Sequence, residues 1–340
     1  MIKSVKNKNL FLSYTVITFV YMYSGVVEKY PDYNGNAMLT CFFTAACAAV
    51  YSFTVSKFFS AGFEEKNGKT AVRAVLAVFC VLYASSNVSF FARSLEVLDD
   101  FYASDFCMIF AAAFAVFCAV FLGKRGKTGV SSFCTLSVIL FGAWTLFGIF
   151  AFFTAKQAVF ISSPVALLSD TEFFGIVKDI LYLNADLAVL AYVLNKNESA
   201  ARKEILKAAI PAGAAAFASV SVINVLKNLL LFGDRLSDEA INPNFTAIRM
   251  IPLFDLPETC VIVNAFACVI KTAVFVSCAF FALKDIKGEK YNGKTTPVFL
   301  FAAVVALFFA LFKSAYVEFF GIFGAVSCAA LCFFLKYKNG

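Results

Sequence analysis

The sequence predicts an all-α polytopic membrane protein, and two observations carry that prediction. Apolar residues make up 61% of the chain and charged residues only 15%, whereas about a quarter of a soluble chain is charged. The charges gather in short connections between continuously apolar runs of about 20 residues, the length that crosses a hydrocarbon core. Continuous runs favour helices, because the strands of a membrane barrel alternate with period two.

Ten apolar runs are long enough to be spans, and together they form a single integral membrane domain, residues 1–340. The predicted spans are 10–27, 37–57, 72–92, 106–123, 130–153, 173–194, 206–230, 257–283, 297–313 and 315–335. With this division, 20 Lys and Arg residues fall on the side of the two termini and six on the other side. This bias predicts that both termini face the cytoplasm. The positive net charge is therefore a topology signal, and we expect no nucleic-acid partner.

The residue types exclude several chemistries. The chain has no histidine, which removes imidazole proton relays, HExxH-type metal sites and Ser-His catalysis. Its 11 cysteines lie within or beside the spans without a C-x-x-C pair, so we interpret them as small apolar packing residues rather than disulfides. No phosphate-cradling loop is present. We therefore expect no enzyme activity, no cofactor and no metal site.

Ten spans divide into two halves of five, repeat one at about 10–153 and repeat two at about 173–335. Because five is odd, the second half must run inverted through the membrane. Inverted repeats are common in secondary transporters, whose binding site lies where the first helix of each half is broken. Spans one and six are therefore the places to look for a site.

Span six contains charged and polar residues where apolar ones would suffice. Each charge near the midplane costs roughly 2.5–3.5 kcal/mol on insertion scales. Asp179 and Asp186 are seven residues apart and project from nearly the same helix face, with Tyr182 and Asn184 close by. That face is expected to look into the bundle interior or a wet cavity. The alternative is that Lys178 neutralises one carboxylate, or that Asp179 lies at the interface.

Span one is short and has Tyr21, Tyr23, Ser24 and Gly25 near its far end. Glycine permits unwinding at low steric cost, and Ser and Tyr can satisfy the freed backbone groups. An ordinary short helix with interfacial tyrosines is the alternative.

Span eight opens with Asp255, Pro257 and Glu258, a pattern typical of a helix N-terminus. Lys271 lies much deeper, and a buried lysine needs a carboxylate partner or a lowered pKa. The candidate partners are Asp186, Asp179 and Glu318. Lys227, Lys313 and Glu318 lie nearer span ends, where snorkelling is the simpler interpretation.

From Pro164 to about Asp285, the order of features resembles the B-subunit permeases of spore germinant receptors. This spore germination permease family belongs to the amino acid–polyamine–organocation (APC) transporter superfamily. "SPVALLSDTEFFGIVKDILYLNADLAVLAYVLNKNESAARK" is similar to the family's fifth-to-sixth-span region, in which a carboxylate lies partway along span six, near the place of Asp186. "AAIPAGAAAFASVSVINVLKNLLLFGDRL" is similar to the seventh span. "NPNFTAIRMIPLFDLPETCVIVNAFACVIK" resembles the Pro-containing loop and the eighth span.

The resemblance implies a LeuT/APC-like fold of five-plus-five inverted repeats and nutrient sensing during spore germination. It also implies a complex with a larger A-type membrane subunit and a C-type lipoprotein, in the inner membrane of a spore or the cell membrane of a spore-forming bacterium. The first half matches only in span count and loop lengths. In the second half, the family's Arg-Glu cluster at the start of span eight differs in this chain, where Leu256 and Pro257 precede Glu258 and the nearest arginine is Arg249.

The leading functional hypothesis is a transporter-fold receptor subunit that binds a small nutrient, an amino acid, between spans one, six and eight. Backbone near Gly25 would receive the ligand carboxylate, and Asp186 an ammonium group or a coupled cation. An ion-coupled secondary amino acid transporter is the alternative, and a scaffolding subunit is a third hypothesis. The candidate ligand-binding residues are Tyr21, Tyr23, Ser24, Gly25, Asp179, Tyr182, Asn184, Asp186, Glu258 and Lys271.

Overall fold

The computed structural model describes ten stretches of the chain: residues 2–28, 37–60, 70–98, 105–154, 177–178, 180–181, 184–196, 198–239, 257–287 and 316–336. These residues are all-helical and contain no strand. The helices are α1 (Ile2–Glu28), α2 (Ala37–Ser60), α3 (Thr70–Leu98), α4 (Asp105–Lys124), α5 (Lys127–Thr154), α7 (Leu187–Asn195), α8 (Ala200–Glu239), α10 (Pro257–Lys287) and α12 (Tyr316–Lys336).

The coarse prediction of a helical membrane protein is confirmed. Within the described parts of the chain, six stretches are long and apolar enough to cross a membrane: Cys41–Phe59, Thr70–Ser89, Cys107–Lys124, Lys127–Phe150, Ala200–Asn228 and Val261–Ile286. Each lies within one of the predicted runs or overlaps most of it. The ninth predicted span, 297–313, lies outside the described residues, as does the beginning of the sixth.

A tight turn joins α4 directly to α5. Gly126 has a φ of 58°, the left-handed region that glycine enters without steric cost. The amides of Arg125 and Gly126 donate to the carbonyls of Leu122 and Gly123, at 3.0 and 2.9 Å, which closes the end of α4. Only the two residues 125–126 therefore separate the helices.

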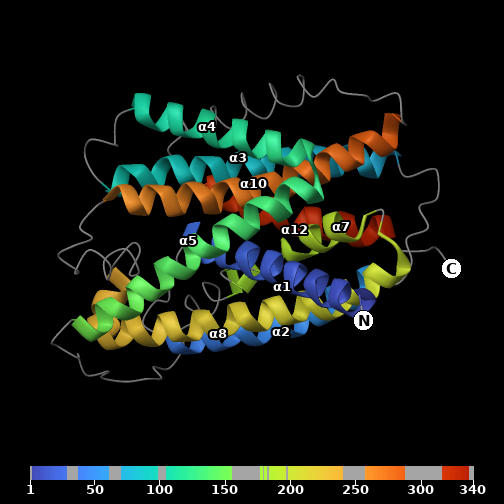
Figure 1. Cartoon of the computed structure of the whole chain (residues 1–340). Coiled ribbons are helices and arrows are strands. Elements are labelled where there is room, and N and C mark those ends of the chain that lie inside the picture. Colours follow the sequence, from blue (N-terminus) through green and yellow to red (C-terminus); the bar gives the residue numbers. More distant parts are fainter. Residues whose placement is uncertain are drawn as a thin grey trace.

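The helices pack as two groups with a central layer between them (Figure 1). In one group α3 packs along α10, and α4 covers α10; in the other, α2 and α1 pack on α8. The short helix α7 lies centrally and contacts α10, α2 and α12. The α1–α8 contact is close: a Cβ added at Gly213 would lie 2.6 Å from Cβ of Thr18. Gly213 therefore permits this close helix approach.

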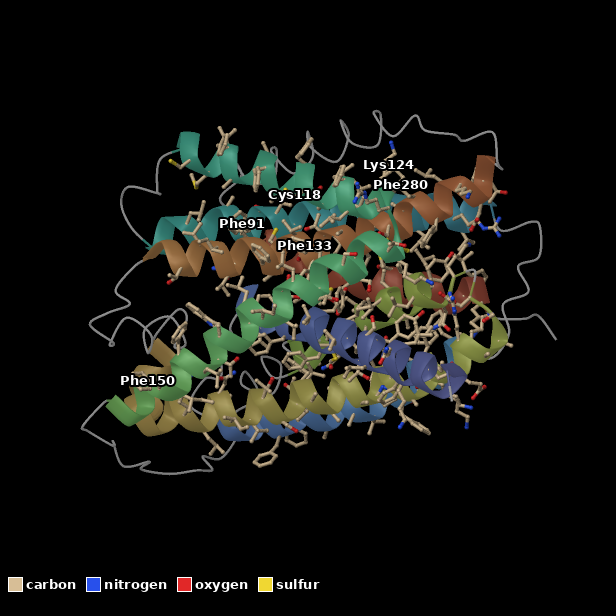
Figure 2. All side chains as sticks on the ribbon, in the orientation of Figure 1. Phe91, Cys118, Lys124, Phe133, Phe150 and Phe280 are labelled. Atoms are coloured by element: carbon tan, nitrogen blue, oxygen red, sulfur yellow. The ribbon has the colours of Figure 1, made fainter. Side chains whose placement is uncertain are left out.

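Large apolar side chains cover the outward faces of several helices. Phe150 projects from α5 in Figure 2 and is 54% exposed. Other exposed phenylalanines on α2 and α4 are Phe42, Phe43, Phe53, Phe110, Phe114, Phe117 and Phe121. Outward-facing apolar surface of this extent is typical of helices in contact with lipid. The ten cysteines whose side chains are described form no disulfide with one another.

Charged side chains tie several helix ends together. Glu198, which follows α7, pairs with Lys127 at the start of α5 and with Arg202 in the first turn of α8. Tyr14 of α1 donates to the same Glu198 carboxylate at 3.3 Å. Lys196 pairs with Asp285 near the end of α10. The end of α7 is thus anchored to four neighbouring helices, α1, α5, α8 and α10.

Candidate functional site

The helical path breaks at residues 184–186, in the middle of the predicted sixth span. Ala185 and Asp186 form a turn, and α7 begins at Leu187. Asp186 is the N-cap residue of α7, with φ −72° and ψ −12°, yet its side chain makes no capping hydrogen bond. An aspartate at this position ordinarily caps the helix. Here the carboxylate is directed elsewhere.

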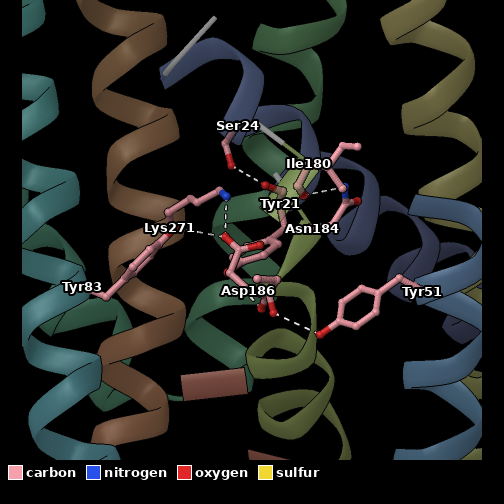
Figure 3. A network of polar contacts seen from close by, with 9 residues as sticks. Tyr21, Ser24, Tyr51, Tyr83, Ile180, Asn184, Asp186 and Lys271 are labelled. Carbon is pink, nitrogen blue, oxygen red and sulfur yellow. Dashed lines mark hydrogen bonds and ion pairs between the residues drawn. The ribbon is translucent and has the colours of Figure 1, made fainter. Parts of the chain in front are cut away.

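The carboxylate of Asp186 forms an ion pair with Lys271 of α10, and both side chains are buried. Tyr83 of α3 donates to the same oxygen, Oδ2, at 3.3 Å (Figure 3). The prediction that Lys271 needs a buried carboxylate, with Asp186 among the candidates, is therefore confirmed. Pairing is required because an isolated charge in a low-dielectric interior is strongly unfavourable.

Helix α1 contributes Tyr21 to the same cluster. The Tyr21 hydroxyl donates to the backbone carbonyl of Asp186 at 3.5 Å. Its ring centroid lies 5.1 Å from Nζ of Lys271, within cation–π range. Ser24 donates to the Tyr21 carbonyl at 2.7 Å, so its hydroxyl is used within its own helix. Spans one, six and eight thus meet at Tyr21, Asp186 and Lys271, which we call the ion-pair cluster together with Tyr83.

The possibility that α1 unwinds at Gly25 is wrong. The helix continues from Ile2 to Glu28 through Gly25, so no half-helix end is available there for a ligand carboxylate. In an apolar setting an unbroken helix satisfies its own backbone groups, which favours continuity over a break. The simpler alternative also needs correction, because Tyr21 and Tyr23 are buried rather than interfacial.

Tyr23 belongs to a second polar contact, on another side of α1. Its hydroxyl lies 2.9 Å from the Thr145 hydroxyl of α5 and accepts a hydrogen bond from Asn224 of α8 at 3.3 Å. Lys227, one turn further along α8, is also buried. Lys227 lies next to the end of the apolar stretch Ala200–Asn228, as predicted, but its side chain is buried in the protein and does not snorkel to water. Gly148 of α5 makes room for it: a Cβ there would lie 2.7 Å from Nζ of Lys227.

Asn184 points away from the ion pair (Figure 3). Its Nδ2 donates to the Ile180 carbonyl at 2.9 Å, and Tyr51 of α2 donates to the neighbouring Ala185 carbonyl at 3.3 Å. A groove of about 670 Å³ opens on this side, between α2, residues 180–185 and α12. The described residues that line it include none from α1. The predicted pocket between spans one and six therefore does not coincide with this groove.

Three predicted site residues cannot be compared with the structure. Asp179 and Tyr182 lie outside the described residues, as does the side chain of Glu258. Two residues of the site were missed from the sequence, Tyr83 and Tyr51. The signal for Tyr83 was present: "YASSN", residues 83–87, is a polar run within an otherwise apolar span.

One oxygen of the ion-pair cluster has spare hydrogen-bonding capacity. Oδ1 of Asp186 is buried and has no hydrogen-bond partner within the described part of the chain. The same holds for both amide atoms of Asn87, one helical turn from Tyr83 on α3. Buried polar atoms are almost always paired with protein, water or ligand. The cluster can therefore accept at least one further hydrogen bond from a donor.

Neither the models of known protein families nor the curated proteins that were searched contain a match to this chain. Its class follows from the helices alone: the described residues are helical and include six segments that suit a polytopic integral membrane protein.

Proposed function

We propose that this chain is a transporter-fold nutrient sensor, the B-type subunit of a spore germinant receptor. In this proposal an amino acid binds at the ion-pair cluster and shifts the arrangement of helices, without a catalytic step, cofactor or metal. The partners are an A-type membrane subunit and a C-type lipoprotein, in the spore inner membrane or the cell membrane of a spore-forming bacterium. The family resemblance of residues 164–285 suggests these finer assignments.

The helix contacts support an inverted repeat. Counted by predicted span, the second packs on the seventh (α2 on α8) and the third on the eighth (α3 on α10). The first and sixth meet through Tyr21 and Asp186. Pairing of equivalent helices is expected around a two-fold axis in the membrane plane. The ion pairs of Glu198 and Lys196 also join helix ends that the charge bias assigns to one side, the cytoplasmic side.

The observation that carries the proposal is the buried Asp186–Lys271 pair at a break in the helix. Opposite charges held side by side match the two ends of a zwitterion. The ligand ammonium group would donate to Oδ1 of Asp186, and the ligand carboxylate would compete with Asp186 for Lys271. Lys271 thus takes the role that the backbone at Gly25 had in the sequence-based hypothesis. A ligand that separates the pair shifts the helices only because it binds the two arrangements with different affinities.

The second candidate is an ion-coupled secondary amino acid transporter. The buried ion pair of Asp186 and Lys271 favours it, because ionisable residues inside membrane segments often line the ion pathways of transporters. Uptake of labelled amino acids into vesicles that contain only this chain separates the two candidates. Accumulation driven by a proton or sodium gradient supports the carrier, and binding without accumulation supports the sensor.

A thermal-shift screen of the purified chain against the standard amino acids tests the proposal, because a ligand stabilises the state that it binds. We expect at least one amino acid to raise the melting temperature of the native chain. The same amino acid should have no effect on the double variant Asp186→Asn/Lys271→Met, which carries no unpaired charge. Glu204→Gln, at an exposed residue of α8, is the matched control and should keep the shift. An equal shift of the melting temperature in the native and double-variant chains would show that the ion-pair cluster does not bind the amino acid.

A further inference from the structure

The groove beside Asn184 is a cavity that is separate from the ion-pair cluster. Its volume of about 670 Å³ lies within the range of small-molecule sites. One wall is a single face of α2, the other is a single face of α12, and Ile180, Leu181, Asn184 and Ala185 form the floor. The lining residues are Ala46, Cys47, Val50, Tyr51, Thr54, Ile180, Leu181, Asn184, Ala185, Val326, Ala329, Ala330 and Phe333.

The walls are apolar, and the groove opens to the outside of the bundle. Val50 on one wall is 69% exposed, and Val326 on the other is 38% exposed. Such surface faces acyl chains when the helices cross a bilayer. The mouth of the groove is therefore accessible to molecules dissolved in the membrane rather than in water.

One end of the groove is closed by aromatic packing between its two walls. Phe58 and Phe59 at the end of α2 contact Phe333 of α12, with ring centroids 4.9 and 5.2 Å apart. Lys336 adds a hydrogen bond from α12 to the Phe58 carbonyl. A chain-like ligand is thus stopped at this end and extends along the helices toward residues 180–185.

The floor supplies a polar group that lacks a donor. Asn184 is only 4% exposed, and its Nδ2 is already used by the Ile180 carbonyl. Its Oδ1 has no hydrogen-bond partner among the described residues. The nearby Tyr51 hydroxyl gives its proton to Ala185. A buried acceptor left unpaired is unfavourable. A ligand that donates a hydrogen bond to Asn184 therefore binds more tightly than a ligand of the same shape that has no donor.

We propose that the groove binds a membrane-dissolved amphiphile, an unbranched alkyl chain that carries one hydrogen-bond donor such as a hydroxyl group. The donor contacts Oδ1 of Asn184, and the chain lies between α2 and α12. A plain acyl chain fills the same volume but leaves Asn184 unpaired. The site lies on the side of Asn184 that faces away from Lys271 (Figure 3), so its contacts do not include the ion-pair cluster. Its occupant packs against Ala185, beside the break.

Photolabelling of the full chain in phosphatidylcholine nanodiscs tests this proposal, because that headgroup has no N–H or O–H donor. The probes are a photoreactive dodecanol and its methyl ether, which differ only in the donor. We expect labelling of residues 177–196 and α12, with the alcohol bound about tenfold more tightly, the value of one net hydrogen bond. Asn184→Leu should remove that difference and leave binding of the ether unchanged.

Two further variants locate the probe. Ala330→Trp places an indole between the walls and should abolish labelling by both probes. Ile139→Trp adds the same side chain at a residue of α5 that is 71% exposed, away from the groove, and should change nothing. Equal affinity of the native chain for alcohol and ether, or undiminished labelling in Ala330→Trp, would overturn the proposal.

Discussion

The two ends of α7 hold charged residues in opposite settings. At its N-terminus, the side chains of Asp186 and Lys271 are 1% and 0% exposed. Beyond its C-terminus, Glu198 is equally buried, but its partners Lys127 and Arg202 are 29% and 48% exposed. Both ends use ion pairs to fasten α7 to neighbouring helices. Only the second has cations that can turn to water when the pair is broken.

This difference indicates different roles. A buried pair leaves an uncompensated charge when one partner is lost, so its members depend on each other. A pair with hydrated cations contributes little net stability, because water replaces the lost partner. The pair at Asp186 is therefore a costly element for a protein to retain, as expected of a functional site in a membrane. The cluster at Glu198 is explained by anchoring alone.

The largest expected effect is at the buried end. Lys271→Met leaves the Asp186 charge unpaired, and we expect a loss of about 3–5 kcal/mol in the free energy of unfolding. Adding Asp186→Asn to this variant should recover most of that loss, because no charge remains. Unfolding in mixed micelles of mild detergent and dodecyl sulfate measures all three chains. Additive effects of the two substitutions would show that the residues do not act as a pair.

A smaller effect is expected at Tyr83. Tyr83→Phe removes one hydrogen bond to the Asp186 carboxylate but keeps the ring, which packs on Phe275 with centroids 4.0 Å apart. We expect a loss of about 1.5–3 kcal/mol, the range for a hydrogen bond to a charged group. The same unfolding assay applies. In the background that lacks both Asp186 and Lys271 charges, the loss should shrink, and an unchanged loss would assign Tyr83 to packing alone.

The smallest effect is expected at the hydrated end. Glu198→Gln should lower the free energy of unfolding by only about 1 kcal/mol, because Lys127 and Arg202 are then solvated. Raising the salt concentration should reduce this difference further, while the effect of Lys271→Met should persist, since buried charges are poorly screened. Lys207→Ala, at an exposed pair with Glu204 of α8, is the control and should have almost no effect. A Glu198→Gln loss as large as that of Lys271→Met would erase the contrast between the two ends.

Much of the fold could be predicted because the helices are continuous apolar runs bounded by charge. The predicted second span, 37–57, and eighth span, 257–283, begin where α2 and α10 begin. Helix ends were less predictable: α8 continues to Glu239, although its apolar stretch ends at Asn228, next to Lys227. Hydropathy indicates which residues can lie in lipid. A helix can nevertheless continue beyond the last of these residues when nothing caps it there.

The candidate site was predictable only in part. A lysine deep in an apolar run requires a carboxylate, and this physical necessity identified Asp186 as a candidate partner of Lys271. Tyr83 was missed because a single tyrosine is compatible with many positions in a span. Gly25 was misread because glycine permits a break without requiring one, and α1 remains intact. Whether these residues bind a ligand stays a prediction.

The brevity of α7 has a mechanical consequence. Its nine residues extend over only about 14 Å, less than half of a hydrocarbon core of about 30 Å. Among the described residues, this short helix is fastened beyond its C-terminus at Glu198 and begins directly after the turn at residues 185–186. A small tilt of α7 about its fastened end would therefore move that turn, and Asp186 with it.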